Sequence, residues 1–230
     1  QYIVYLLHLA HEQKLDEADS FYHISDVVPW WERSLAYRRN AAGDFNATEA
    51  PRIFKTHMLC DWLPKHGRYI YLERDPEEVL ASYHQLYVAY LGYTGSFEGF
   101  AKDFLRGKVQ YGRHDLHVSH WAKRRSSSSV FWLRYEDLQK DPKKQLGRLV
   151  KFLGLNVTKE QINRVTTLTT KTRMKRLQEK FDHAGEILKQ QGVRPGAFIN
   201  VKSTTTKQHA KQALEQRIAQ KETATQIRFF

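Results

Sequence analysis

The sequence contains a single cysteine, Cys60, among its 230 residues. An intramolecular disulfide is therefore excluded, and we expect a reducing, cytoplasmic compartment. The sequence also lacks any apolar run near the length of a membrane span, and its first residues lack the layout of a signal peptide. We accordingly expect no membrane partner.

Several catalytic motifs are missing as well. The sequence has no Gly-x-Ser-x-Gly nucleophile elbow, no recognisable Cys/His nucleophile arrangement and no Gly-x-x-Gly-Lys loop to hold phosphate. Asp182-His183 has no second ligand pair at a metal-binding spacing, so we expect no metal. These absences weigh against a serine hydrolase, a P-loop kinase and a metal enzyme.

What the sequence does have is an excess of positive charge. Its formal net charge is +12 and its pI is about 9.7. Such a chain attracts polyanions, which include nucleic acid, acidic membranes and multiply charged anionic cofactors. A well-solvated basic surface would give the same composition, so charge alone does not choose among these. A hydrophobic content of 41% indicates a globular chain with a core.

Three short apolar runs, residues 52–55, 69–72 and 130–133, have the pattern of strands. Their nearly continuous hydrophobicity is typical of strands buried on both faces of a parallel sheet. The alternation of strands with helices predicts an α/β domain. The helices that we expect span residues 1–15, 75–90, 97–105, 114–123, 142–153, 159–165 and, more weakly, 207–221.

Polar residues follow each predicted strand, and ligands of open α/β sheets bind at the carboxyl ends of strands. Lys55 and His57 follow the first run, Arg74 the second and Tyr135 the third, while Ser82 lies in the helix after Arg74. An arginine and a serine beside a helix start suit a phosphate. A histidine near a lysine could remove a proton while the cation stabilises negative charge. Taken singly, each residue is as well explained as a solvated or structural group.

Four segments follow one another along the chain: PRIFKTH, RYIYLERDPEEVLASYHQLY, GKVQYGRHDLHVSHW and FWLRYEDLQKDPKKQLGRLVKFLG. In their order along the chain and in their amino acids, these segments resemble the cytosolic sulfotransferase family, over about residues 1–206. These enzymes transfer a sulfuryl group from 3′-phosphoadenosine-5′-phosphosulfate (PAPS) to a hydroxyl or amine. The resemblance implies a three-layer, P-loop-like fold with a central parallel sheet flanked by helices. It also implies PAPS as co-substrate and no metal.

The resemblance assigns roles to the residues that match the family's motifs. His57 resembles the base that deprotonates the acceptor, and Lys55 the cation beside the transferring sulfuryl group. Arg74 and Ser82 resemble the clamp on the 3′-phosphate, and Tyr135 the tyrosine that contacts adenine.

Two further pairs match the nucleotide-binding residues of the family with departures. Thr169 and Thr170 stand near the nucleotide, although a lysine follows them where the family has an aromatic residue. Arg194 and Gly196 align with a tail segment that holds the 3′-phosphate. Pro195 replaces the lysine between them, which removes a cation and a backbone donor, so we expect a reshaped clamp.

Aromatic residues are candidates for an acceptor pocket, and they suit a flat or hydrophobic hydroxyl compound. Core packing explains each of them equally well. The candidates are Tyr22, Trp30, Trp31, Tyr87 and Phe97, together with His117, which matches a histidine near the family's acceptor.

The family opens with a strand and a Pro-Lys-Ser-Gly-Thr-Thr-Trp loop, and this chain resembles it from the following helix onward. We therefore expect one sulfotransferase domain over residues 1–230, truncated at that strand and loop. The family's dimer segment would fall at about 202–211, where Lys211 replaces an acid, so a homodimer stays open. The alternative is a degenerate, non-catalytic paralogue that binds nucleotide or nucleic acid. The positive net charge supports this alternative, and of the two ligands we expect nucleotide rather than nucleic acid.

Overall fold

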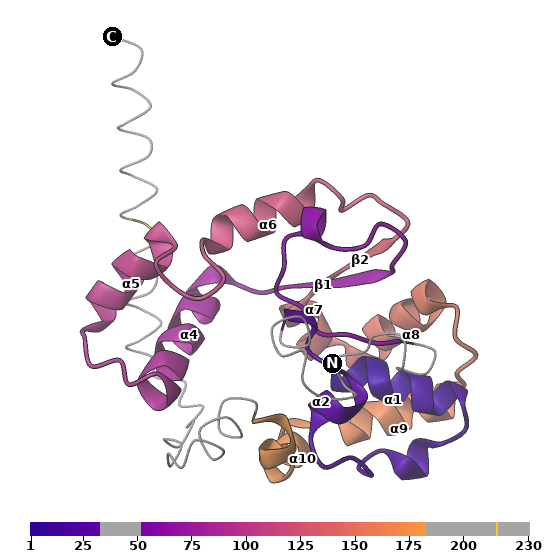
Figure 1. The fold of residues 1–230 in the computed structure, drawn as a ribbon. Coiled ribbons are helices and arrows are strands. Elements are labelled where there is room, and N and C mark those ends of the chain that lie inside the picture. The colour runs from indigo at the N-terminus through magenta and orange to yellow at the C-terminus, as the bar shows by residue number, and fades with distance from the viewer. Residues whose placement is uncertain (33–51, 183–214, 216–230) are drawn as a thin grey trace. The chain divides into compact units, whose positions relative to one another are not determined.

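The computed structural model describes residues 1–32, 52–182 and 215. The chain forms two compact units, the first made of Gln1–Leu72 with Arg124–His183 and the second of Glu73–Lys123 with Ala184–Phe230. Figure 1 traces the chain through its elements. The single domain over residues 1–230 stays a prediction. Among the described residues, the structure has no helix whose length and apolar character would let it cross a membrane.

The sheet pairs two strands, β1 (Tyr69–Glu73) and β2 (Val130–Arg134), which lie side by side in Figure 1. They run parallel, and the pairing begins where the N–H of Tyr69 donates to the Ser129 carbonyl at 2.8 Å. Parallel neighbours need a crossover connection, which the helices between the two strands supply. The prediction of an α/β fold with a parallel sheet is therefore confirmed.

The prediction of a strand at residues 52–55 is wrong. Lys55 makes only an isolated parallel bridge with Trp30, through two backbone hydrogen bonds of 2.9 and 2.8 Å. The next N–H on that side of the segment belongs to His57, and it donates to the side chain of Glu32. The partner segment is helical directly after Trp30, so a side chain takes the place of the next backbone rung and the ladder stops after one bridge.

Helices and short 3-10 turns are the other regular elements in the described part of the first unit. The predicted helix over residues 1–15 ends early because Gln13 adopts a left-handed φ of 61°, which turns the chain away from the helix axis. The helices predicted over 142–153 and 159–165 are confirmed. The elements are α1 (Tyr2–His11), η1 (Leu15–Glu17), α2 (Ile24–Val27), η3 (Cys60–Trp62), α7 (Tyr135–Lys140), α8 (Pro142–Leu153), α9 (Lys159–Leu168), α10 (Lys171–Arg176) and η4 (Gln178–Phe181).

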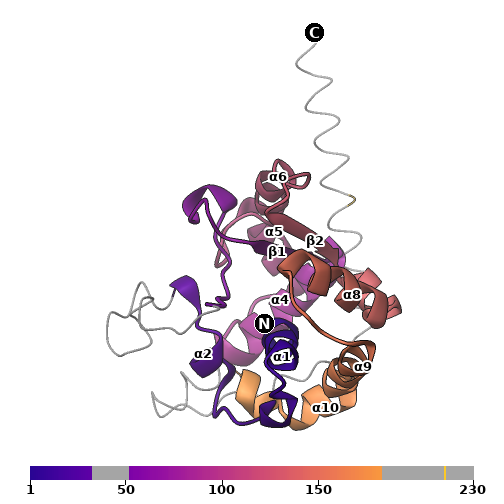
Figure 2. The ribbon, with the colours of Figure 1, turned by 90° about the vertical axis from the view of Figure 1, so that its right-hand side faces the viewer.

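The core of the first unit lies where α1, α8, α9 and β2 meet. α9 packs against both α1 and α8, and α8 also contacts β2; Figure 2 shows these helices from the side. Leu6 and Leu7 of α1, Leu146 of α8 and Val165 of α9 are almost completely buried. Each such side chain contributes about 1.5–3 kcal/mol through burial. This packing holds the start of α1 in a fixed place within the unit.

The described part of the second unit contains three helices. The carboxylate of Asp75 caps the first of them by accepting from the N–H groups of Glu77 at 2.9 Å and Glu78 at 3.1 Å, as the Asp-Pro-Glu-Glu sequence predicts. The rings and aliphatic groups around Phe100 form its core. The helices are α4 (Pro76–Tyr90), α5 (Phe97–Arg106) and α6 (His114–Ala122), and all three were predicted.

The helix predicted over residues 207–221 lies outside the described residues, apart from Glu215, which is helical.

Candidate active site

Lys55 and His57 contact the same indole ring. The Nζ of Lys55 lies 4.0 Å from the centroid of the Trp30 ring, and the His57 ring meets Trp30 edge-on with centroids 5.4 Å apart. Residues two apart in an extended segment project to the same side, which explains the shared contact. A cation over an aromatic face contributes about 0.5–2 kcal/mol, according to its exposure. The structure thus gathers both predicted catalytic residues at one predicted substrate-binding residue.

Trp31 belongs to the other side of this pairing. Its ring packs edge-on against Phe54 with centroids 5.4 Å apart. The ring of Trp30 therefore contacts Lys55 and His57, whereas the ring of Trp31 contacts Phe54.

Glu32 holds the backbone beneath these residues. Its Oε1 accepts a short hydrogen bond from the N–H of His57 and another from the Thr56 hydroxyl at 3.1 Å. The Thr56 hydroxyl in turn accepts from the N–H of Met58 at 3.0 Å. An acid directly after two tryptophans matches no motif, so nothing in the sequence singles out Glu32. Only the pairing of the two segments reveals it.

The start of α1 lies beside the same cluster. The side-chain amide of Gln1 donates to the Val28 carbonyl at 3.5 Å. The N–H groups at a helix start carry partial positive charge. The first turn of α1 therefore adds partial positive charge near the segment that carries Trp30.

Arg74 and Ser82 both lie in the second unit. The Nε and Nη2 of Arg74 donate to Oε2 of Glu78 at 3.1 and 3.0 Å. Ser82 follows Glu78 by one helical turn, so the two share a face of α4. In the part of the chain that the structure describes, the Ser82 hydroxyl makes no hydrogen bond. A guanidinium and a hydroxyl at the beginning of a helix form a donor set that fits a phosphate.

The other predicted nucleotide-binding residues that are described lie at helix ends of the first unit. Tyr135 is the first residue of α7 and directly follows β2. The hydroxyl of Thr169 donates to the Val165 carbonyl at 2.9 Å, and that of Thr170 donates to the Thr167 carbonyl at 3.1 Å. Both hydroxyls thus stabilise the end of α9.

Tyr87 packs in the aromatic core of the second unit. Its ring lies 5.0 Å from that of Phe100, and its hydroxyl accepts from the N–H of Gln110 at 2.7 Å. His117 is half-buried on α6, and it adds to burial in lowering the pKa of His114. The contacts of Tyr87 are those of a packed core side chain.

The remaining acceptor candidates also fall in separate places. Tyr22 is 79% exposed in the first unit, which does not suit a pocket wall. Phe97 contacts the ring of His84 in the second unit. Arg194, Gly196 and the segment 202–211 lie outside the described residues. The first unit therefore contains Trp30, Trp31, Lys55, His57, Tyr135, Thr169 and Thr170, and the second contains Arg74, Ser82, Tyr87 and His117.

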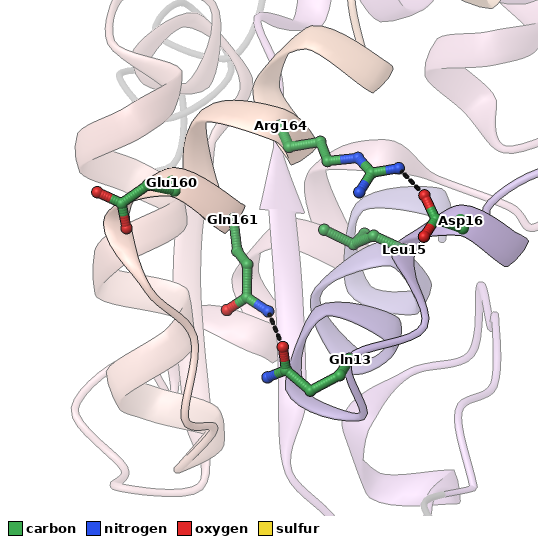
Figure 3. Close-up of a pocket in the computed structure, with 6 residues that line it drawn as sticks. All are labelled: Gln13, Leu15, Asp16, Glu160, Gln161 and Arg164. Carbon is green, nitrogen blue, oxygen red and sulfur yellow. Dashed lines mark hydrogen bonds and ion pairs between the residues drawn. The ribbon is translucent and has the colours of Figure 1, made fainter.

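A cavity of about 250 Å³ opens elsewhere in the first unit, between the end of α1 and the start of α9. Figure 3 shows the ion pair of Arg164 with Asp16 and the hydrogen bond from Gln161 to Gln13 at its edge. None of the predicted site residues lines it. Arg164 is already paired with Asp16, and the side chains of Gln161 and Gln13 are hydrogen-bonded to each other. We therefore do not place the predicted chemistry in this cavity.

Comparison with known proteins identifies the family. A model described as "Sulfotransferase domain" matches residues 1–222. Sulfotransferase 1A1 of Mus musculus is 34% identical over 135 residues, which are 56% of this chain and 46% of that protein. The chain spans about half the length of the curated relatives that it matches.

Two solved structures are similar as well. One is mouse sulfotransferase SULT7A1 complexed with PAP, at 28% identity and a TM-score of 0.52 over 54% of this chain and 47% of that one. The other is retinol dehydratase with retinol and PAP, at 19% identity and a TM-score of 0.67 over 92% of this chain and 75% of that one. The second likeness establishes the fold. With the family model matching nearly the whole chain, the chain belongs to the sulfotransferase domain family.

Proposed function

We propose that the protein transfers a sulfuryl group from PAPS to a hydroxyl of a small, hydrophobic or aromatic acceptor. The observation that supports this most directly is the contact of both Lys55 and His57 with the ring of Trp30. It provides a base, a cation and an apolar surface at one place. Membership of the sulfotransferase domain family supports the same activity.

In the proposed reaction, the acceptor oxygen forms a bond to sulfur while the bond from sulfur to the bridging phosphate oxygen breaks. His57 takes the proton of the acceptor hydroxyl, and the electron pair of the broken bond leaves with the phosphate. Lys55 stabilises the negative charge that develops around the transferring group. As in phosphoryl transfer, positioning and charge stabilisation supply most of the acceleration.

We assign the nucleotide to the donors predicted from the family. Arg74 and Ser82 would hold the 3′-phosphate, a role supported by the place of Arg74 just before α4 and of Ser82 one turn after Glu78, the partner of Arg74. Tyr135, Thr169 and Thr170 would contact the nucleoside. Arg194 and Gly196 complete the proposed set. The mouse sulfotransferase that resembles this chain was solved with PAP, which supports a nucleotide of this kind.

The acceptor site that we propose is built around Trp30, with Trp31, Tyr87 and His117 as further candidates. The face of an indole favours flat, apolar compounds. We propose a cytoplasmic setting on the evidence of the single cysteine, and we leave a homodimer as an open proposal.

The proposal is tested by following labelled sulfuryl transfer from PAPS to a panel of phenols and alicyclic alcohols with the full-length protein. We expect a sulfated product and an equal amount of PAP. His57→Ala should lower kcat by about 10²–10⁴-fold, the usual contribution of a general base. Lys55→Met should also lower kcat. Matched controls are His66→Ala and Lys65→Ala, both at exposed positions of the same unit.

A His57→Ala protein that keeps full activity would refute the base assignment. The alternative of a non-catalytic binding protein is tested by titrating PAP and a generic DNA duplex at moderate salt. PAP binding without product from any hydroxyl compound would favour a nucleotide-binding paralogue. Preference for the duplex would favour a nucleic-acid-binding protein.

A further inference from the structure

The pairing of Lys55 with Trp30 ends in an unusual way. In a parallel pair, each N–H on one side of a strand donates to a backbone carbonyl of its neighbour. Lys55 follows this rule, since its N–H donates to the Pro29 carbonyl at 2.9 Å. His57, two residues later, donates instead to Oε1 of Glu32. One side-chain oxygen therefore sets where the backbone of His57 lies.

The same oxygen also fixes the residues on either side of His57. The Thr56 hydroxyl donates to Glu32 Oε1 at 3.1 Å and accepts from the N–H of Met58 at 3.0 Å. Residues 56 to 58 are thus tied to one carboxylate atom through two N–H groups and a hydroxyl. A mobile backbone would let the His57 ring leave its place at Trp30.

The second oxygen of the carboxylate contributes no such bond. Glu32 Oε2 is shielded from solvent and accepts no hydrogen bond among the described residues. A shielded carboxylate oxygen without a donor costs free energy. Glu32 therefore holds residues 56 and 57 through the length of its side chain and the two hydrogen bonds that Oε1 accepts. Oε2 adds no hydrogen bond to these.

We propose that Glu32 is a positioning residue for the reaction: it holds the His57 backbone so that the imidazole faces the acceptor hydroxyl. The catalytic consequence rests on the proposed function, whereas the contact itself can be tested without any activity. A glutamine has the same length and an oxygen that can occupy the place of Oε1. An aspartate keeps the charge but is one methylene shorter. The two substitutions therefore separate reach from charge.

The experiment compares Glu32→Gln, Glu32→Asp and Glu32→Ala in the full-length protein. NMR follows the amide proton of His57, which resonates downfield while it donates to a carboxylate. We expect this resonance to move upfield in Glu32→Ala, and kcat to fall by about 100-fold, as for a reacting group misplaced by about 1 Å. The KM for PAPS should change little. Glu32→Gln should stay close to the wild type and Glu32→Asp should not.

Two further variants keep the experiment decisive. Glu12→Ala removes an exposed carboxylate from the end of α1 and should leave the His57 amide resonance and kcat unchanged. Thr56→Val keeps Glu32 but removes the hydroxyl link, and it should lower kcat less than Glu32→Ala does. Glu32→Asp takes the place of Glu32→Ala if the alanine variant fails to fold.

An unchanged His57 amide resonance in Glu32→Ala, or in Glu32→Asp where the alanine variant does not fold, would overturn the inference, whatever the activity. Activity retained by Glu32→Asp but lost in Glu32→Gln would also overturn it, because charge would then matter more than reach. If the wild-type protein forms no sulfated product, the proposed function fails and the catalytic part of the inference fails with it. The amide resonance would still report whether Glu32 holds His57.

Discussion

The guanidinium of Arg74 is held by the carboxylate of Glu78, with Nη2 3.0 Å from Oε2. Both side chains are partly buried, at 31% and 18% exposure. The arginine that we propose for the 3′-phosphate thus has an acid beside it, on the helix face that also carries Ser82. This carboxylate orients the arginine but also repels an incoming phosphate.

Replacing Glu78 with glutamine should strengthen PAP binding. The amide oxygen can still accept from Arg74, while the negative charge near the phosphate is removed. At the effective dielectric of a partly exposed site, we expect the affinity to rise by about threefold to tenfold. Isothermal titration with PAP at constant salt measures the change.

The matched control is Glu77→Gln, which removes the same charge from a position about 100° around the helix. It should change PAP affinity less than Glu78→Gln does. A clear loss of affinity in Glu78→Gln would mean that orienting Arg74 outweighs the repulsion, and the prediction would be wrong.

Two aspartates of the first unit pair with arginines in different surroundings. Asp19 pairs with Arg173, with exposures of 33% and 34%, and it also accepts from the Tyr2 hydroxyl at 2.7 Å. Asp16 pairs with Arg164, with exposures of 88% and 49%. Exposed ion pairs contribute little because solvent screens them, whereas a partly buried network leaves its partners unsatisfied when it is broken.

We therefore predict unequal costs for removing the two aspartates. Asp19→Ala should lower the free energy of unfolding by about 1–3 kcal/mol, since the Tyr2 hydroxyl and Arg173 lose their shared acceptor. Asp16→Ala should cost less than about 1 kcal/mol. Urea unfolding of both variants at neutral pH measures the difference, and equal costs would contradict the argument.

The sequence predicted the helices well because their end signals are local. Asp75 and Pro76 predicted the start of α4, and the structure shows the cap that they form. The same reasoning failed at residues 52–55, whose apolar pattern suits a strand. Whether a strand forms depends on its neighbour, and here the neighbouring segment turns into a helix at Trp31, which ends the pairing after one bridge.

The candidate site was predictable in part. Lys55 and His57 were predicted to be site residues at the end of one apolar run, and both do contact Trp30. Neither Glu32 nor Glu78 was expected. Each acts by contacting a residue that belongs to a recognisable motif, His57 for Glu32 and Arg74 for Glu78. Such a contact leaves no pattern in a single sequence.

The stability of the second unit should depend on pH through His84. Its ring lies 5.0 Å from Phe97 and 5.3 Å from Phe100, and its Nε2 is shielded without a hydrogen-bond partner among the described residues. Burial lowers the pKa of His84 below 6.5, against an opposing effect of the nearby Glu98 charge. The folded protein therefore disfavours protonation of this ring.

The direction of the pH dependence follows from this shift. Above pH 6.5 both states leave His84 neutral, so its contribution to stability is complete. As the pH falls below 6.5 the unfolded chain binds the proton first, and the free energy of unfolding falls until the folded pKa is reached. His84→Phe should make this fall smaller, in urea unfolding measured between pH 7.5 and about 5. His66→Phe, at an exposed turn position, should leave it unchanged. An unaltered pH dependence in His84→Phe would contradict the argument and direct attention to His114 of the same unit, whose pKa burial also lowers.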